Sequence, residues 1–223
     1  TGNPNFVLRP FMKPLPLIIG SCLFSIGAFF TARHFSNHNR DQSEAMKRSS
    51  EVGEIITSYR DVPVRSNGPD YTVSHGKHYA ADGYYYGQKW QCVEFVKRFY
   101  RDAFNHKMPD VWGHARDFYN PETSPGSINP KRGMWQFENG GSVAPQADDL
   151  LVFDYTPFGH VAVISEVREH EIEVIQQNVR GKPRETHLLS RKGNRFYVGT
   201  NRKPVAWLRV PSRHPAEQVS PAG

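Results

Sequence analysis

The stretch that decides the fold is Trp90-Gln91-Cys92-Val93-Glu94-Phe95, and the pattern that it begins continues to Phe104. Apolar side chains recur there with the period of an amphipathic helix, which predicts a helix from about Gln91 to Phe104 with one buried face. The positions expected on its solvent side carry charged residues, namely Glu94, Lys97, Arg98 and Arg101. Cys92 stands at the start of this helix, where unpaired backbone N–H groups and the helix dipole favour thiolate over thiol. The stretch therefore predicts a nucleophilic cysteine presented by a helix.

A histidine and a group of amides further along the chain complete this chemistry. His160 follows a turn and enters an apolar strand, where its ring can take the Cys92 proton and return it to a leaving amine. Gln176-Gln177-Asn178 ends the neighbouring strand, and we expect a side-chain carbonyl of Gln176 or Asn178 to accept a hydrogen bond from His160 Nδ1–H. Gln91 and the backbone N–H of Cys92 are the expected donors to the oxyanion. Taken alone, Cys92 would be a small buried hydrophobe and His160 a structural histidine, so it is the order Cys, His, amide that indicates a triad.

The remaining pattern places helices first and strands afterwards. We expect a helix at about 43–59 and a second, short one at 112–119, whereas residues 120–141 are rich in Pro and Gly and predict a surface loop. Apolar runs then predict strands at 150–155, 160–167, 171–177, 185–189 and 205–210. This order of elements indicates an α+β domain.

The cysteine and histidine segments resemble the motifs of the CHAP family, the cysteine- and histidine-dependent amidohydrolases and peptidases. The segment around Cys92, with Arg98 one turn on, is similar to the nucleophile motif of that family. Asp149-Leu150-Leu151-Val152-Phe153 and Gly159-His160-Val161-Ala162-Val163-Ile164 are similar to its histidine segment. The resemblance covers about residues 60–210. It implies a papain-like fold of the CHAP/NlpC-P60 type, in which a cysteine-bearing helix packs on an antiparallel sheet that supplies the histidine.

The longer form of the cysteine motif, Tyr86-Gly87-Gln88-Lys89-Trp90-Gln91-Cys92, is similar to the amidase domains of bifunctional glutathionylspermidine synthetase/amidases and their trypanothione relatives. Those domains carry Glu where this chain has Gln176. An amide oxygen can still orient an imidazole, but it stabilises imidazolium less than a carboxylate does. We therefore expect Gln176→Glu to retain or raise activity, and a large loss of turnover would remove Gln176 from the triad. Tyr86 and Glu94, on either side of the cysteine, are expected to contact the substrate.

The N-terminal part of the chain predicts a membrane anchor. Residues 15–32 carry no charged side chain and are just long enough to span a bilayer as a single helix, with a buried core helix as the alternative. Basic residues flank both ends, so orientation stays open, although an extracytoplasmic catalytic domain is preferred. The predicted organisation is an N-terminal tail and anchor or signal segment (1–32), a linker and helix (33–60), a CHAP-like domain (61–212) and a flexible tail (213–223).

The composition of the chain indicates which kinds of binding partner to expect. The chain has 28 basic and 22 acidic residues, a net charge of +6 that favours anionic surroundings such as phospholipid or cell-wall polymers. The basic residues form no stripe interleaved with aromatic residues, so we expect no nucleic-acid binding. His75 and His78 have no third ligand nearby in the sequence, and no Gly-rich phosphate loop occurs, so neither a metal nor a cofactor is expected.

These observations predict a membrane-anchored cysteine amidase that acts on a small amide substrate or a cell-wall peptide. The longer cysteine motif favours a glutathionylspermidine-like substrate. The predicted anchor and the positive charge favour instead a cell-envelope amidase or endopeptidase that cleaves peptidoglycan. A third hypothesis belongs to another class: an inactive, anchored CHAP-like binding module, which the amide at Gln176 would permit.

Overall fold

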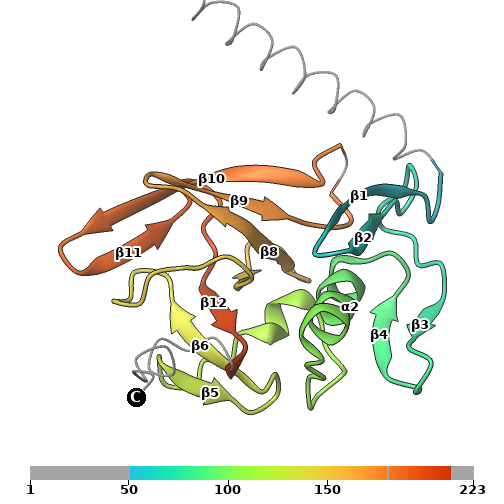
Figure 1. The fold of residues 1–223 in the computed structure, drawn as a ribbon, viewed down its shortest axis with the longest axis horizontal. Helices are drawn as coiled ribbons and strands as arrows, with labels where there is room; N and C mark the ends of the chain where they lie inside the picture. Colours follow the sequence, from blue (N-terminus) through green and yellow to red (C-terminus); the bar gives the residue numbers. More distant parts are fainter. Residues whose placement is uncertain (1–50, 180, 212–223) are drawn as a thin grey trace, which may run out of the picture. The chain divides into compact units, whose positions relative to one another are not determined.

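The computed structural model describes residues 51–179 and 181–211, and this part of the chain is built around an antiparallel sheet of eight strands (Figure 1). In spatial order the strands are β11 (Arg195–Val198), β10 (Arg184–Lys192), β9 (Glu171–Ile175), β8 (His160–Val167), β7 (Leu150–Phe153), β12 (Ala206–Arg209), β6 (Met134–Glu138) and β5 (Ser127–Asn129). Every pair of neighbours runs antiparallel. The helix α2 (Cys92–Phe104) packs on this sheet, so the fold is α+β as the sequence predicts.

The central strands are buried on both faces. In β7, Leu150 and Val152 belong to one hydrophobic cluster, and Leu151 and Phe153 belong to another, because successive side chains of a strand point to opposite faces. The residues of α2 that pack into the first cluster are Phe95, Val96, Phe99 and Tyr100. Burying a side chain of this size stabilises the fold by roughly 1.5–3 kcal/mol. This packing holds the first turn of α2, and therefore Cys92, against the sheet.

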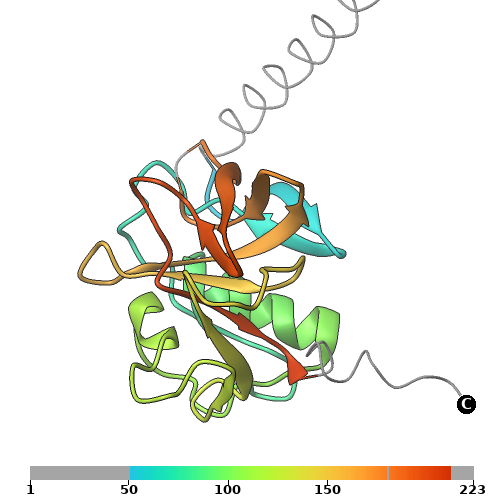
Figure 2. The same ribbon diagram turned by 90° about the vertical axis from the view of Figure 1, so that its left-hand side faces the viewer.

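Two hairpins complete the surroundings of α2. β1 (Ile55–Tyr59) pairs with β2 (Val62–Arg65), and β3 (Lys77–Tyr79) pairs with β4 (Tyr85–Gln88). Figure 1 shows α2 between the sheet and the β3–β4 hairpin, and the helix contacts both β2 and β4. The β1–β2 hairpin lies beside β9 and β10 in both ribbon views (Figures 1 and 2), where Arg184 donates to the Ser58 carbonyl at 3.0 Å.

The hairpins correct the predicted solvent side of α2. Glu94, Lys97 and Arg98 are at most 5% exposed, and of the four charged residues only Arg101 keeps a partly exposed side chain. The prediction that this face is wet is therefore wrong for three of the four. The helix pattern marks which side of a helix is apolar, but it cannot reveal that a second element, here β4, covers the polar side as well.

The structure has the strand β1 where the sequence predicts the last part of a helix at 43–59. The first three residues of β1, Ile-Ile-Thr, are β-branched, and its turn to β2 consists of Arg60 and Asp61, both with positive φ (47° and 62°). A two-residue turn of this kind suits the twist of a hairpin. A strand therefore replaces the end of the predicted helix, and the part of that helix before residue 51 lies outside the described residues.

The loop predicted at 120–141 also contains strands. β5 and β6 pair with each other inside it, and β6 pairs with β12 from the far end of the domain. The helix predicted at 112–119 is reduced to the short 3-10 helix η1 (Ala115–Phe118), and β11 was not predicted. These elements are short, and β6 also depends on a partner far along the chain, so their local sequence carries little signal.

Among residues 51–179 and 181–211, no helix is both long enough and apolar enough to cross a membrane. The span predicted at 15–32 and the tail predicted at 213–223 fall outside these residues.

Candidate active site

Cys92 is the first residue of α2, and its partly buried side chain lies against the start of β8. Burial raises the pKa of the Cys92 thiol, and backbone N–H groups of Val161, Val93 and Cys92 itself, which are directed at the sulfur, lower it by less. The prediction that the helix start favours thiolate is therefore wrong in its net direction. The expected backbone donors are present, but desolvation of the charged form outweighs them.

His160 is the first residue of β8, and the glycine before it allows this placement. Gly159 has a φ of +70°, and a Cβ there would lie 2.5 Å from the Arg116 nitrogen and 2.6 Å from the Phe153 carbonyl oxygen. No side chain fits in that space without moving backbone. The close approach holds the start of β8 between β7 and η1.

The His160 ring is neutral at pH 7. The residue is only 9% exposed, and burial lowers the pKa of His160 to about 4. The hydrogen bond with Gln176 and the charge of Glu185 act in the opposite direction, while His187 lowers the pKa further. A buried, neutral imidazole is able to accept a proton, which is what a general base requires.

Gln176 follows the end of β9 and orients the His160 ring. Its Oε1 accepts a hydrogen bond from His160 Nε2 at 2.9 Å, and its Nε2 donates to the Lys182 carbonyl at 2.9 Å and to Glu185 Oε2 at 3.2 Å. Both amide hydrogens have acceptors, so the amide oxygen must face the ring and His160 Nε2 must carry the ring hydrogen.

The prediction that Nδ1 of His160 faces the side-chain amide is wrong. We predicted a bond from His160 Nδ1, but Gln176 approaches the outer edge of the ring from the neighbouring strand and meets Nε2. Nδ1 is bonded to Cγ and so lies nearer the β8 backbone, where the Val161 N–H meets the Cys92 sulfur. The tautomer with hydrogen on Nε2 leaves Nδ1 as the basic nitrogen.

Asn178 and Gln91 form a separate contact at the other side of the cysteine. Asn178 Nδ2 donates to Gln91 Oε1 and, at 2.9 Å, to the Tyr71 carbonyl. Gln91 Nε2 in turn donates to the carbonyls of Val73 at 3.0 Å and Tyr71 at 3.4 Å. The structure thus brings Gln176, and not Asn178, onto His160. Both hydrogens of the Gln91 amide are engaged, so donation to an oxyanion would require it to exchange an acceptor, and this role stays a prediction.

Comparison with known proteins bears on the same residues. Residues 83–178 match the family model of the CHAP domain, a range that includes Cys92, His160 and Gln176. The chain contains a CHAP domain. The candidate site lies within this domain.

Relatives that match this part of the chain are larger proteins. The bifunctional glutathionylspermidine synthetase/amidase of Escherichia coli strain K12 is 34% identical over 110 residues, which cover 46% of this chain and 17% of that protein. Trypanothione synthetase of Crithidia fasciculata is 28% identical over 122 residues, 53% of this chain and 19% of that protein. The match therefore covers less than a fifth of the length of either relative.

Glu94 and Tyr86 do not line an open cleft in the CHAP domain. Glu94 is fully buried, and its carboxylate binds His78 at 2.7 Å, Arg98 at 2.6 Å and Gln177 at 2.7 Å. Tyr86 is 4% exposed and donates its hydroxyl to Asp102 at 2.9 Å. The prediction of substrate contact fails for both, because the β3–β4 hairpin encloses this side of α2.

The Glu94 cluster is a structural feature that sequence reasoning missed. Burial raises the pKa of Glu94. Its interactions with His78, Arg98 and Gln177 together lower the pKa by more than burial raises it, so the net pKa lies below its ordinary value. Gln177 also donates to the Gln91 carbonyl at 3.1 Å, immediately before the cysteine. The cluster thus ties the end of β9 to the start of α2. The spacing of Glu94 and Arg98 by one turn was a visible signal, but burial was not.

Two further residues near the cysteine were also missed. Tyr155 lies close enough to both Cys92 and Glu185 for their charges to raise its pKa, after the larger effect of burial. Glu185 accepts a hydrogen bond from the Gln176 amide. Neither belongs to a motif, because the places of both depend on packing between segments that are far apart in the sequence. The described residues contain no group of three or more His, Cys, Asp or Glu side chains arranged to hold a metal ion.

Proposed function

We propose that this CHAP domain hydrolyses an amide bond, with Cys92 as the nucleophile, His160 as base and acid, and Gln176 as the residue that orients His160. The observation that supports this most directly is the 2.9 Å hydrogen bond between His160 Nε2 and Gln176 Oε1, at the strand end against which the sulfur of Cys92 lies. The bond leaves Nδ1 unprotonated, which suits a general base.

The reaction then runs through a thioester. Because the thiol and the imidazole are both neutral at pH 7, the Cys92 proton passes to His160 Nδ1 as the sulfur attacks the amide carbonyl carbon. The carbonyl oxygen becomes an oxyanion, for which the backbone N–H of Cys92 and a repositioned Gln91 amide are the proposed donors. The C–N bond breaks as His160 protonates the amine. Water then gives a proton to His160 and attacks the thioester, which releases the acid and restores the thiol.

The substrate favoured here is an amide like that of glutathionylspermidine. Support comes from the similarity to the bifunctional glutathionylspermidine synthetase/amidase of Escherichia coli, and from the resemblance of the segment Tyr86–Cys92 to the cysteine motif of such amidase domains.

Product analysis tests this function. The full chain is incubated with glutathionylspermidine, and free glutathione and spermidine are measured by mass spectrometry. We expect Cys92→Ala and His160→Ala each to lower turnover by roughly 10³-fold or more, since each removes a member of the proton-transfer unit. His170→Ala, at a side chain 79% exposed, is the matched control and should retain activity. Turnover that survives in Cys92→Ala would overturn the proposed nucleophile.

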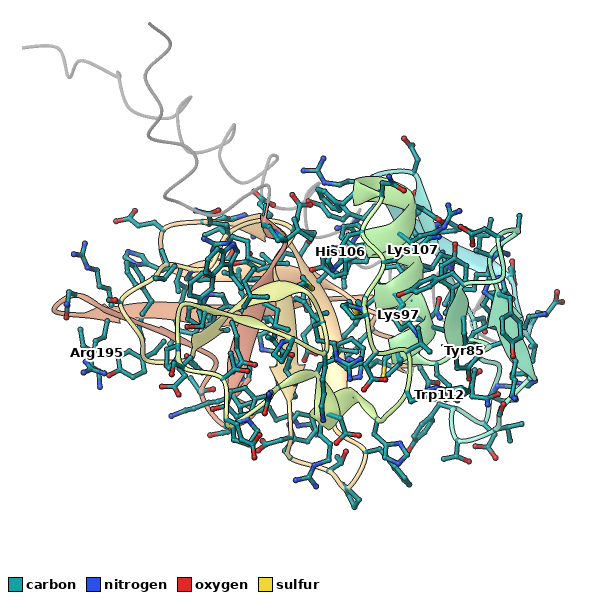
Figure 3. The ribbon with its side chains drawn as sticks, turned by 90° about the horizontal axis from the view of Figure 1, so that it is seen from below. Tyr85, Lys97, His106, Lys107, Trp112 and Arg195 are labelled. Carbon is teal, nitrogen blue, oxygen red and sulfur yellow. The ribbon has the colours of Figure 1, made fainter. Side chains whose placement is uncertain are left out.

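A cell-wall peptide is the second candidate substrate, and one surface feature favours it. Tyr85 packs against Tyr79 and against Trp112, with ring centroids 5.1 Å apart in both pairs, and Trp112 is 62% exposed (Figure 3). Exposed aromatic clusters mark binding surfaces, and flat rings suit the faces of sugars. Release of peptides from purified peptidoglycan by wild type, but not by Cys92→Ala, would favour this substrate. Inertness toward both substrates would favour the binding-module hypothesis.

We also propose that residues 15–32 anchor the protein in a membrane and that the CHAP domain lies on the extracytoplasmic side. The uncharged run supports the anchor. A topology reporter fused after Gly223 tests the orientation: periplasmic or extracellular reporter activity is expected, and a reporter active only in the cytoplasm would contradict it. An extracytoplasmic domain would have access to peptidoglycan, whereas a cytoplasmic one would not.

A further inference from the structure

The orienting residue of the proposed triad is an uncharged amide, yet a carboxylate stands directly behind it. Glu185 lies on β10, which pairs with β9 so that Glu185 is opposite Val174, two residues before Gln176. Its Oε2 accepts a hydrogen bond from Gln176 Nε2 at 3.2 Å. A continuous chain of hydrogen bonds therefore runs from the ring of His160 through the amide to a negative charge.

The chain of bonds has a direction that Glu185 helps to set. An amide can be turned so that either its oxygen or its nitrogen faces the imidazole, and only the first orientation places the ring hydrogen on Nε2. Glu185 and the Lys182 carbonyl are acceptors only, so together they require the nitrogen of Gln176 on their side. Without the carboxylate, one of two contacts that hold this orientation is lost.

The charges around the site also favour an electrostatic role. Glu185 acts on His160 to favour imidazolium, whereas His187, also on β10, acts against it. Lys182 lies 3.5 Å from Glu185 Oε1 and partly neutralises it, but its side chain is 58% exposed against 30% for Glu185, so solvent weakens that pair. Tyr155 interacts electrostatically with both Glu185 and the cysteine, and Arg202 places a positive charge 5.6 Å from the Tyr155 ring.

We infer that Glu185 is a positioning residue for catalysis: it holds the Gln176 amide, and through it the His160 tautomer, and it stabilises the imidazolium that forms when Cys92 gives up its proton. This inference rests on the roles proposed above for Cys92 and His160. In this chain the negative charge that accompanies the reacting imidazole comes from β10, one residue further from the ring than a carboxylate at position 176 would be.

The first test measures the reactivity of Cys92, which needs no substrate. In the full chain, the rate of Cys92 alkylation by iodoacetamide is followed from pH 5 to pH 9 by mass spectrometry. Glu185→Gln keeps the size of the side chain and removes its charge, so the thiolate–imidazolium pair becomes rarer. We expect the rate near pH 7 to fall by roughly three- to tenfold, equivalent to about half to one pKa unit. Glu171→Gln, an exposed carboxylate on the adjoining strand, is the matched control and should leave the rate unchanged.

The same substitution of Glu185 in the Gln176→Glu variant separates an electrostatic effect on the alkylation rate from a structural one. In Gln176→Glu the carboxylate at position 176 faces His160 directly, and Glu185 then repels it. We therefore expect Glu185→Gln to lower the alkylation rate in the wild-type background and to leave it unchanged or raise it in the Gln176→Glu background. A purely structural role would lower the rate in both. Thermal unfolding of the wild type, the two single variants Glu185→Gln and Gln176→Glu, and the double variant identifies any protein that fails to fold.

The possible outcomes test the role of Glu185 separately from the proposed amidase function. Equal alkylation profiles for wild type, Glu185→Gln and Glu171→Gln would overturn the role of Glu185, and so would an equal loss in both backgrounds. If the predicted reversal occurs but no amide is hydrolysed, the role of Glu185 in setting the Cys92–His160 pair stands and the proposed function fails. If amides are hydrolysed and Glu185→Gln changes neither alkylation nor turnover, the function stands and Glu185 has no part in it.

Discussion

The burial of His160 determines how the protein responds to acid. In the folded chain the pKa of His160 is about 4, against an ordinary value of 6.5. The unfolded state therefore binds more protons between these values, and stability is lost as the pH falls from 6.5 towards 4. His160→Gln removes this contribution. Between pH 7 and pH 5, we expect the free energy of unfolding of wild type to fall by about 2 kcal/mol more than that of the variant.

Urea unfolding at the two pH values measures this difference, in which the contributions of the carboxylates that both proteins share cancel. His170→Gln serves as the control, because its exposed histidine should leave the wild-type dependence intact. The same loss between pH 7 and pH 5 in all three proteins would show that His160 is not held neutral by the fold.

Individual site residues differed in how well their sequence marked them. Cys92, His160 and Gln176 each lie at an end of a helix or strand, and the ends of such elements can be located from periodicity and turn residues. The protonation of the site could not be found in this way. The thiol pKa depends on how deeply β8 buries the sulfur, and this is a property of the packing.

At the scale of elements, the turn from β7 into β8 determines where His160 stands. Gly159→Ala would place a Cβ within 2.6 Å of two backbone atoms, so either the start of β8 or η1 must move. We expect this variant to lose more than about 3 kcal/mol of stability and most of its amidase activity. Gly193→Ala has a similar φ of +62° but nothing within 4 Å, and should lose only about 1 kcal/mol and keep its activity.

Thermal unfolding and turnover of the two variants check this prediction. Equal effects of the two substitutions would mean that the positive φ alone is responsible, and the close approach of β8 to η1 would then have no part in placing His160.

The elements themselves were predictable where the local sequence pattern is long and regular. α2 begins within a residue of its predicted start, and β8 has its predicted bounds. β1 was mistaken for helix, and β5 and β6 for loop, because short strands gain their stability from pairing across the sheet. β6, for example, is held by β12, some seventy residues away along the chain.

For the molecule as a whole, the resemblance to the CHAP family implies an antiparallel sheet with a cysteine-bearing helix, and the structure has both. What it does not predict is the enclosure of α2 between that sheet and the β3–β4 hairpin (Figure 1). This enclosure converts Glu94 and Arg98 from expected surface residues into a buried cluster that links the end of β9 to the start of α2. The placement of Cys92 relative to β8 thus depends on the contacts that α2 makes with the sheet, with the β3–β4 hairpin and with the end of β9.

Trapping the thioester on Cys92 tests the proposed nucleophile at its first covalent step. The full chain is mixed with glutathionylspermidine or a peptidoglycan fragment, quenched in acid within a single turnover, and its peptides are mapped by mass spectrometry. We expect the acyl half of the substrate on the peptide that contains Cys92, slower formation of this adduct in His160→Ala, and none in Cys92→Ala. Turnover of the amide with Cys92 unmodified throughout, or an acyl group found on another residue, would contradict the proposed role of Cys92.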